Sequence, residues 1–473
     1  MVNAWIWLAL LIPVATAAGL ALLRGPWARR AGWLALAALA LGLGALGAAA
    51  LLIPDAETQE LWHLDRLALP FILNTGVVSL AAFVYALGDL RQAPRSALAY
   101  AAMLLYAASM LASVIVADAL LFLLAWEMTV LSSSALLLGW GKGQDRPRIT
   151  LKYFLYSQAG SLLIMAALAR LAQLAGSTRL DALAALGTSL SPAAAYGLAG
   201  ALLLGFMIKL GVWPVHGWLP DAHTAAPMPV SIMLAGANLG LAAYGILRMA
   251  LPLFPEAAAP LQLTLLLVAL GSQVYGAALC FATDDLKRVL AYSSVSQMGY
   301  VLFGLATLSA RGITGGLTHL VCHGVYKSLL FIGVGLLGHT FGHQQAGRLH
   351  GVGRLLPGIA LAMAVGAVGL TGWPPSGGFY GEWMILAGGL ATPYHWLGYL
   401  EIIAPLMTTA YVAYYLIHLG AGQPEEAPQQ ARLPAAMRLS LYALAGLALL
   451  AGLFPSPLVQ WATGAAAMAG GGL

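Results

Sequence analysis

Two ionisable residues stand in the middle of long apolar runs. Glu127 lies in the run LLFLLAWEMTVL, and Lys209 lies in GFMIKLG. A charge at the centre of a membrane costs roughly 3 kcal/mol or more, so such a residue faces the interior of a helix bundle and finds a partner there. A static ion pair is one interpretation, but a buried pair adds little net stability. We therefore expect Glu127 and Lys209 to pair and to take part in proton transfer.

A second group of ionisable residues has the spacing of one helix face. His319, His323 and Lys327 follow one another every four residues in HLVCHGVYK, and such positions stack along a helix. Because histidine exchanges a proton near neutral pH, this stripe predicts a proton relay, with purely structural histidines as the alternative. Histidines at this spacing also bind zinc, but the sequence lacks HExxH and Lys327 opposes a cation, so we expect no metal.

Further ionisable residues accompany two Gly- and Pro-rich breaks in apolar runs. His216, Asp221 and His223 lie in and after VWPVHGW, and Glu382 follows TGWPPSGG. We interpret Glu382 as a further proton carrier. His216, Asp221 and His223 are candidates for gating proton entry, with bracing of the loop as the alternative. Glu401, near the start of a later apolar run, is expected at the membrane interface.

The composition places these residues in a membrane. The chain has 473 residues, of which 61% are hydrophobic and only 8% are charged, whereas soluble domains carry about 25% charged residues. A soluble enzyme, a nucleic-acid-binding protein and a disordered protein are thereby excluded. The two cysteines, Cys280 and Cys322, lie in apolar runs without a CxxC motif. We therefore expect no metal, iron–sulfur cluster or other cofactor in this chain.

The apolar runs predict an all-α membrane protein with about fourteen spans. A crossing needs about 20 apolar residues, and the connections between runs are short. The runs lie at 3–23, 32–53, 68–88, 97–116, 118–140, 150–174, 193–212, 227–250, 260–282, 290–308, 313–337, 356–389 (interrupted), 396–418 and 437–455.

The distribution of basic residues predicts the orientation. Loops that follow odd-numbered spans hold most of the 22 Lys and Arg residues, whereas loops that follow even-numbered spans hold Arg66, Arg170, Arg179, Arg248 and Arg311. Basic loops stay on the cytoplasmic side. We therefore expect both termini outside, in a bacterial or archaeal cytoplasmic membrane.

The two broken runs predict an internal repeat. Each is the fourth of five consecutive spans, and five spans per unit make the second unit insert upside down. Paired broken helices in an inverted repeat indicate a transport site. The predicted organisation is three N-terminal spans (1–96), a first unit of spans 4–8 (97–250), a second unit of spans 9–13 (260–418) and a C-terminal span with a tail (437–473).

Several long motifs together resemble one known superfamily. They are LAWE at Glu127, KLGVWPVHGWLPDAHTAAPMPVS from Lys209, DLKRVLAYSSVSQMGY at 285–300, HLVCHGVYKSLLF at 319–331 and GGFYGEW at 377–383. These motifs resemble the antiporter-like membrane subunits of respiratory complex I, Mrp-type cation/proton antiporters and energy-converting hydrogenases. The resemblance covers spans 4–13 and is closest to the middle antiporter-like subunit of complex I.

The resemblance implies roles for single residues. Glu127 resembles the glutamate that pairs with the central lysine, which is Lys209 here. His319, His323 and Lys327 resemble the residues that link two half-channels, and Glu382 resembles the terminal ionisable residue. One position departs from the pattern, because members typically carry a lysine in the eighth helix where this sequence has Gly240, two residues after Asn238.

The expected function is proton translocation within a multi-subunit, redox-driven complex of the NADH/quinone oxidoreductase or membrane-bound hydrogenase type. The resemblance implies other membrane subunits and a soluble redox module as partners, with no redox site in this chain and no nucleic acid. Three alternatives remain: an Mrp-type Na+/H+ antiporter subunit, a membrane partner of a CO2-hydrating zinc protein, and a non-pumping structural subunit.

Overall fold

The computed structural model describes residues 2–24, 30–52, 61–91, 93–187, 189–421, 428 and 433–470. Within these ranges the chain forms helices without a β-strand. Thirteen helices are long and apolar enough to cross a membrane, and the interrupted run at 356–389 supplies a fourteenth crossing from two shorter helices. The predicted all-α membrane fold is confirmed. Residue 53 of the second predicted span and residues 471–473 of the tail lie outside the described residues.

α1 and α2 carry no charged or amide side chain apart from Asn3, whereas α3 has buried polar residues that include Asn74 and Ser79. α1 and α2 pack against each other, and α1 also packs against α4. The helices are α1 (Val2–Leu22), α2 (Ala31–Leu52) and α3 (Ala68–Asp89).

The first unit contains the first predicted break. α8 ends at Lys209 and Leu210, because Gly211 adopts a left-handed conformation with φ +74° and Pro214 cannot continue the hydrogen-bond ladder. The unit consists of α4 (Ser96–Ile115), α5 (Ala119–Trp140), α6 (Arg146–Ala175), α7 (Leu180–Gly187), α8 (Pro192–Leu210), α9 (Leu219–Ala225), α10 (Met228–Met233), η2 (Leu234–Asn238), α11 (Gly240–Gly245) and η3 (Ile246–Ala250).

The eighth span is irregular. It runs from α10 to η3, and η2 and η3 are π-helical, a geometry that occurs mostly as short bulges at functional sites. The sequence predicts the span but not these two bulges.

The second unit repeats the break. Gly372, with φ +64°, follows α16, and Pro374 and Pro375 precede α17. The unit consists of α12 (Pro255–Cys280), α13 (Leu286–Ala306), α14 (Ala310–Phe341), η4 (Ala346–Arg348), α15 (Val352–Leu355), α16 (Pro357–Leu370), α17 (Gly377–Leu390), α18 (His395–Glu401) and α19 (Ile403–Gly420).

The last crossing and the tail are both helical. α20 (Ala435–Leu453) is the predicted C-terminal span, and α21 (Ser456–Gly470) packs against α14 and α3. The sequence predicts only a tail after residue 455. Small residues make the packing possible, since Ala462, Ala465, Ala466 and Ala469 are buried.

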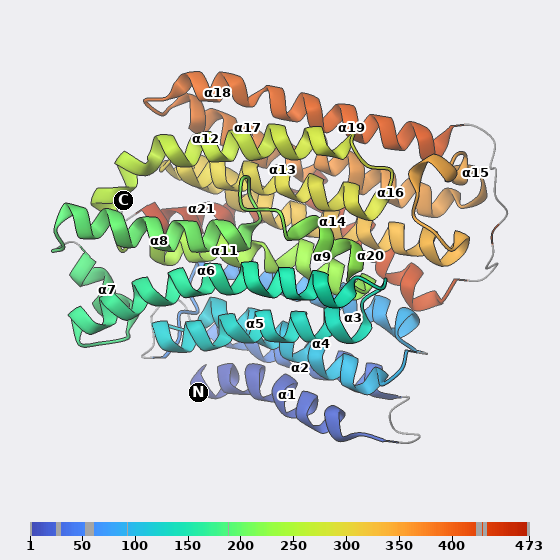
Figure 1. Cartoon of the computed structure of the whole chain (residues 1–473), viewed down its shortest axis with the longest axis horizontal. Coiled ribbons are helices and arrows are strands. Elements are labelled where there is room, and N and C mark those ends of the chain that lie inside the picture. The colour runs from blue at the N-terminus through green and yellow to red at the C-terminus, as the bar shows by residue number, and fades with distance from the viewer. Residues whose placement is uncertain are drawn as a thin grey trace.

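The helices run side by side along the long axis of the molecule (Figure 1). α14 lies at the centre and is buried along nearly its whole length, with α13 and the irregular eighth span also buried beside it. The start of α1 and helix α21 lie at the same end of the bundle (Figure 1), as expected if both termini share one side of the membrane.

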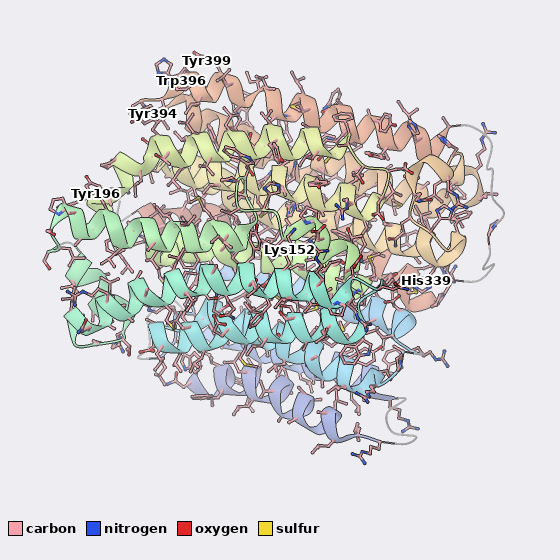
Figure 2. The ribbon with its side chains drawn as sticks, viewed as in Figure 1. Lys152, Tyr196, His339, Tyr394, Trp396 and Tyr399 are labelled. Carbon is pink, nitrogen blue, oxygen red and sulfur yellow. The ribbon has the colours of Figure 1, made fainter. Side chains whose placement is uncertain are left out.

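Aromatic residues mark this same end. Figure 2 shows Tyr196, Tyr394, Trp396 and Tyr399 at the left edge of the bundle, whereas His339 lies at the opposite edge. Tyr and Trp concentrate at membrane–water interfaces. The aromatic residues therefore mark one membrane–water interface at this end of the bundle.

Candidate functional site

Lys209 lies in the last turn of α8, directly before the break. Its side chain is 2% exposed, and its Nζ makes no hydrogen bond to the described protein. The ammonium lies 5.5 Å from the centre of the Trp126 ring of α5. The Trp126 indole is itself held by a hydrogen bond of 3.1 Å to Ser161 Oγ. The lysine is thus positioned by an aromatic face, and its donors remain available.

Glu127 does not form the direct ion pair with Lys209 that the sequence predicts. Gln158 Nε2 of α6 donates a 2.6 Å hydrogen bond to Glu127 Oε2, and no carboxylate oxygen of the described residues lies within 4.0 Å of the Lys209 ammonium. Glu127 directly follows Trp126, on which Lys209 rests. The acid and the base are thus both positioned at Trp126, without a direct ion pair between them.

His319, His323 and Lys327 form a buried row on α14. His319 and His323 are each 2% exposed, and Lys327 is fully buried. Lys327 Nζ donates to the Leu290 carbonyl at 2.7 Å and to the Ser293 hydroxyl. Neither ring nitrogen of His319, nor Nε2 of His323, has a hydrogen-bond partner in the described protein. Buried polar groups are almost always satisfied by protein or ordered water, so this row suits proton transfer through water.

Glu382 meets this row from α17. Its Oε1 lies 3.9 Å from Nδ1 of His319, and its carboxylate rests against Gly372, where an added Cβ would lie 2.1 Å from Oε2. The close approach of α17 to α14 depends on Gly381, whose missing Cβ leaves room for the His319 backbone. The second break therefore brings Glu382 to the His319 end of the row.

The departure in the eighth span removes a charge from the middle of the axis. Gly240 faces α14, since a Cβ there would lie 3.2 Å from the Leu320 side chain. Asn238, at the end of the π-helical η2, is fully buried, and neither its amide oxygen nor its nitrogen has a described protein partner. An amide thus lies two residues before Gly240, the position at which the sequence resemblance implies a lysine.

The candidates near the first break lie in different surroundings. Asp221 accepts hydrogen bonds from Lys152 of α6 at 2.8 Å and from Arg288 of α13 at 2.9 Å, an arrangement that braces the two units. His223 is fully buried and stacks on Phe331 of α14. His216 packs edge-on against Tyr275 of α12. Only His223 lies against the α14 row, so it is the best placed of the three for proton transfer.

Sequence reasoning missed a second buried carboxylate. Glu401, expected at the membrane interface, is 3% exposed, and its Oε1 accepts a hydrogen bond of 3.4 Å from Gln273 Nε2. α18 ends at Glu401 because Pro405, four residues on, has no N–H for the Glu401 carbonyl. An acid four residues before a proline within an apolar run was the signal available in the sequence.

The chain is similar to known membrane proteins over most of its length. A family model described as "NADH:quinone oxidoreductase/Mrp antiporter, TM" matches residues 116–408. This chain belongs to that family. It is 34% identical over 337 residues to NAD(P)H-quinone oxidoreductase chain 4 3 of Picosynechococcus sp., covering 71% of the chain and 60% of that relative. It is also 34% identical to NADH-quinone oxidoreductase subunit M of Pseudomonas aeruginosa, covering 72% of the chain and 69% of that relative.

The family resemblance extends to the whole fold. A chain of respiratory complex I from Thermus thermophilus superposes with a TM-score of 0.89 at 26% identity, covering 99% of both chains. The matched family region contains Glu127, Lys209, the α14 row and Glu382. Among the described residues, no group of three or more His, Cys, Asp and Glu side chains is placed to hold a metal ion.

Proposed function

We propose that this chain translocates protons as one membrane subunit of a multi-subunit, redox-driven complex. The observation that carries the proposal is the line of buried polar groups from Lys209 through Asn238 and the α14 row to Glu382. Most of these groups have donors or acceptors that no described protein group satisfies. Polar and ionisable groups inside a membrane protein are costly to bury, and they mark ion pathways.

The proposed steps use only the side chains of this chain. Glu127 holds the counter-charge near Lys209. A change of charge in an adjoining subunit alters the balance between Glu127 and Lys209, and Lys209 then releases its proton toward the α14 row. His323 and His319 carry the proton along α14, and Glu382 exchanges it with the far side of the membrane.

The membrane partners and location form part of the same proposal. The relatives carry the names of NADH- or NAD(P)H-quinone oxidoreductase subunits, which favours a redox module over a purely secondary antiporter. Glu382 supports the same assignment, because it resembles the terminal ionisable residue and the sequence is most similar to the middle antiporter-like subunit of complex I. We place the chain in the cytoplasmic membrane of a bacterium or archaeon, with both termini outside.

A second candidate function is that of a non-pumping structural subunit. The observation that favours it is Gly240, where the axis lacks the lysine typical of the family. In that case, replacing Lys209 changes assembly of the complex but leaves proton transport unchanged. Asn238 supports the pumping function, because its unpaired amide lies in the same span.

Mass spectrometry of the complex purified with this chain in a mild detergent tests the proposal. An NADH/quinone or [NiFe]-hydrogenase module that co-purifies with the chain is the expected result. Co-purification with only small, hydrophobic Mrp-type subunits would overturn the redox-driven assignment and favour Na+/H+ antiport. A zinc-bearing soluble partner would instead indicate CO2 hydration.

A further inference from the structure

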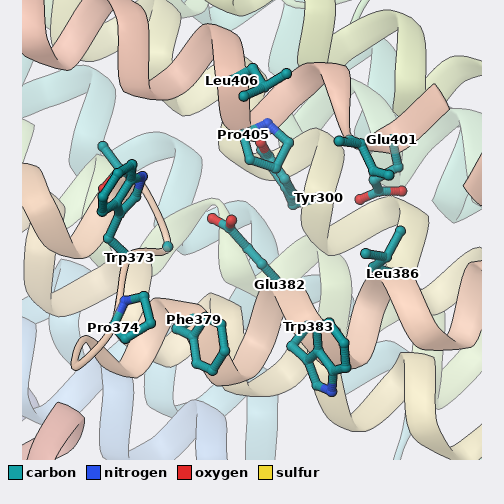
Figure 3. Close-up of a pocket in the computed structure, with 13 residues that line it drawn as sticks. Tyr300, Trp373, Pro374, Phe379, Glu382, Trp383, Leu386, Glu401, Pro405 and Leu406 are labelled. Carbon is teal, nitrogen blue, oxygen red and sulfur yellow. The ribbon is translucent and has the colours of Figure 1, made fainter. Parts of the chain in front are cut away.

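A cleft at the side of the second unit holds two carboxylates from different helices. Its volume is about 280 Å3, and its lining includes Tyr300, Trp373, Glu382, Trp383, Glu401 and Leu406 (Figure 3). Trp373, Trp383 and Leu406 are each more than half exposed. The cleft is therefore open at an apolar rim, with the two acids deeper inside. We call it the lateral cleft.

Each acid has at least one carboxylate oxygen without a partner among the described residues. Glu401 Oε2 and Glu382 Oε1 make no hydrogen bond to the described protein. Only 3% of the Glu401 residue is exposed. No lysine or arginine of the described residues forms an ion pair with either carboxylate. A buried charge without a cation is costly, and two carboxylates that share a site oppose ionisation of both. The arrangement suits two acids that hold protons rather than charges.

Tyr300 connects this pair with the α14 row. Its ring stacks on His319 with the ring centres 5.2 Å apart, and its hydroxyl lies 3.5 Å from Thr408 Oγ1 of α19. His319 in turn lies 3.9 Å from Glu382. A proton that reaches His319 therefore arrives beside Glu382, one of the two carboxylates that line the lateral cleft.

We propose that Glu401 is a second proton-carrying residue at the end of the axis, and that it acts with Glu382 as a carboxyl pair in the lateral cleft. This inference rests on the proposed proton translocation and adds a residue to it. The Pro405 kink places Glu401 at the end of α18, and Gln273 orients the carboxylate through Oε1. The oxygen that remains, Oε2, is the one that accepts and releases the proton.

Proton transport by vesicles that contain the assembled complex provides the first test. Glu401→Gln keeps the size of the side chain and an acceptor for Gln273, so the complex is expected to assemble and to lose most of its proton transport. Glu401→Asp restores a carboxyl group and should recover part of the transport. Glu256→Gln is the matched control, since Glu256 is an exposed acid in the first turn of α12, and it should transport like the wild type.

The outcomes separate this inference from the proposed function. Wild-type transport by Glu401→Gln, together with loss of transport in Glu382→Gln, would overturn the role of Glu401 and leave the proposed function intact. Wild-type transport by both Glu382→Gln and Lys209→Met would overturn the proposed function itself.

A labelling experiment tests the carboxyl pair without relying on transport. Dicyclohexylcarbodiimide is apolar and adds across a protonated carboxyl group to give a stable N-acylurea, so it can enter through the apolar rim. Peptide mapping by mass spectrometry should find the adduct on Glu401 and Glu382 in the wild type, and on Glu401 in Glu382→Gln. Absence of the Glu401 adduct from both proteins would contradict a protonated Glu401 in the cleft.

Discussion

At the scale of single residues, the site contains bases and acids kept slightly apart. Lys209 rests on Trp126, Glu127 is bonded to Gln158, and His319 stands 3.9 Å from Glu382. A tight ion pair would hold its proton and its charges in place, whereas groups with free donors and acceptors can change state when a neighbour moves. The spacing therefore favours proton transfer over static bracing.

A residue outside the spans gives a pH-dependent prediction. Burial, and after it the nearby charge of Arg248, lower the pKa of His63 from 6.5 to about 4. Between pH 6.5 and about 4 the unfolded chain binds this proton and the folded chain does not, so stability falls as the pH falls. From pH 7 to pH 5 the loss is about 2 kcal/mol.

Thermal unfolding of the purified complex at pH 7 and pH 5 checks the effect of His63. His63→Gln cannot take up the proton and is expected to lose less stability than the wild type over this interval. An equal loss of stability in both proteins would show that folding does not lower the pKa of His63, which would contradict its buried position.

At the scale of elements, the contact of α17 with α14 decides where Glu382 lies. A Cβ on Gly381 would lie 2.9 Å from the backbone of His319, so Gly381→Ala must push the two helices apart. We expect a loss of about 1–3 kcal/mol in stability and weaker proton transport. Gly446→Ala on α20 is the control, because a Cβ there has no neighbour within 4 Å.

Thermal unfolding and proton transport of the two glycine variants check this prediction. Gly446→Ala should be as stable as the wild type, or more stable by about 0.5–1 kcal/mol, since alanine favours a helix over glycine. If both variants behave alike, the close approach of α17 to α14 does not set the position of Glu382.

The sequence predicted the spans and breaks well for a physical reason. Long apolar runs, left-handed glycines and prolines act locally, so Gly211 and Pro214 indicate the first break without knowledge of the fold. The π-helical bulges, the packing of α21 and the burial of Glu401 depend on contacts between distant segments. Gln273 and Glu401 are 128 residues apart, and no local pattern connects them.

At the scale of the whole molecule, one aspartate joins the two units. Asp221 of α9 bonds to Lys152 within the first unit and to Arg288 of the second. Lys287, beside Arg288, also donates to the Ala226 carbonyl at the end of α9. The break in the first unit is therefore tied to the start of α13, and movement of α9 is coupled to the second unit.

Asp221→Asn is expected to weaken this link. Because the three side chains are partly exposed to solvent, the loss of stability should be about 1 kcal/mol, and it should shrink at high salt. Thermal unfolding at low and high ionic strength checks the result. Asp181→Asn is the control, since the ion pair of Asp181 is with Arg179, two residues away in the same unit. An equal effect of both variants would contradict a specific link between the units.

The measurement that tests the central claim most directly is proton translocation by vesicles containing the complex with Lys209→Met. Methionine fills the buried site without a charge, and removal of an unpaired buried ammonium should leave the stability unchanged or higher. We predict an assembled complex that no longer moves protons, with a smaller loss in Glu127→Gln. Wild-type proton translocation by an assembled Lys209→Met complex would contradict the account, because the axis would then carry protons without its central base.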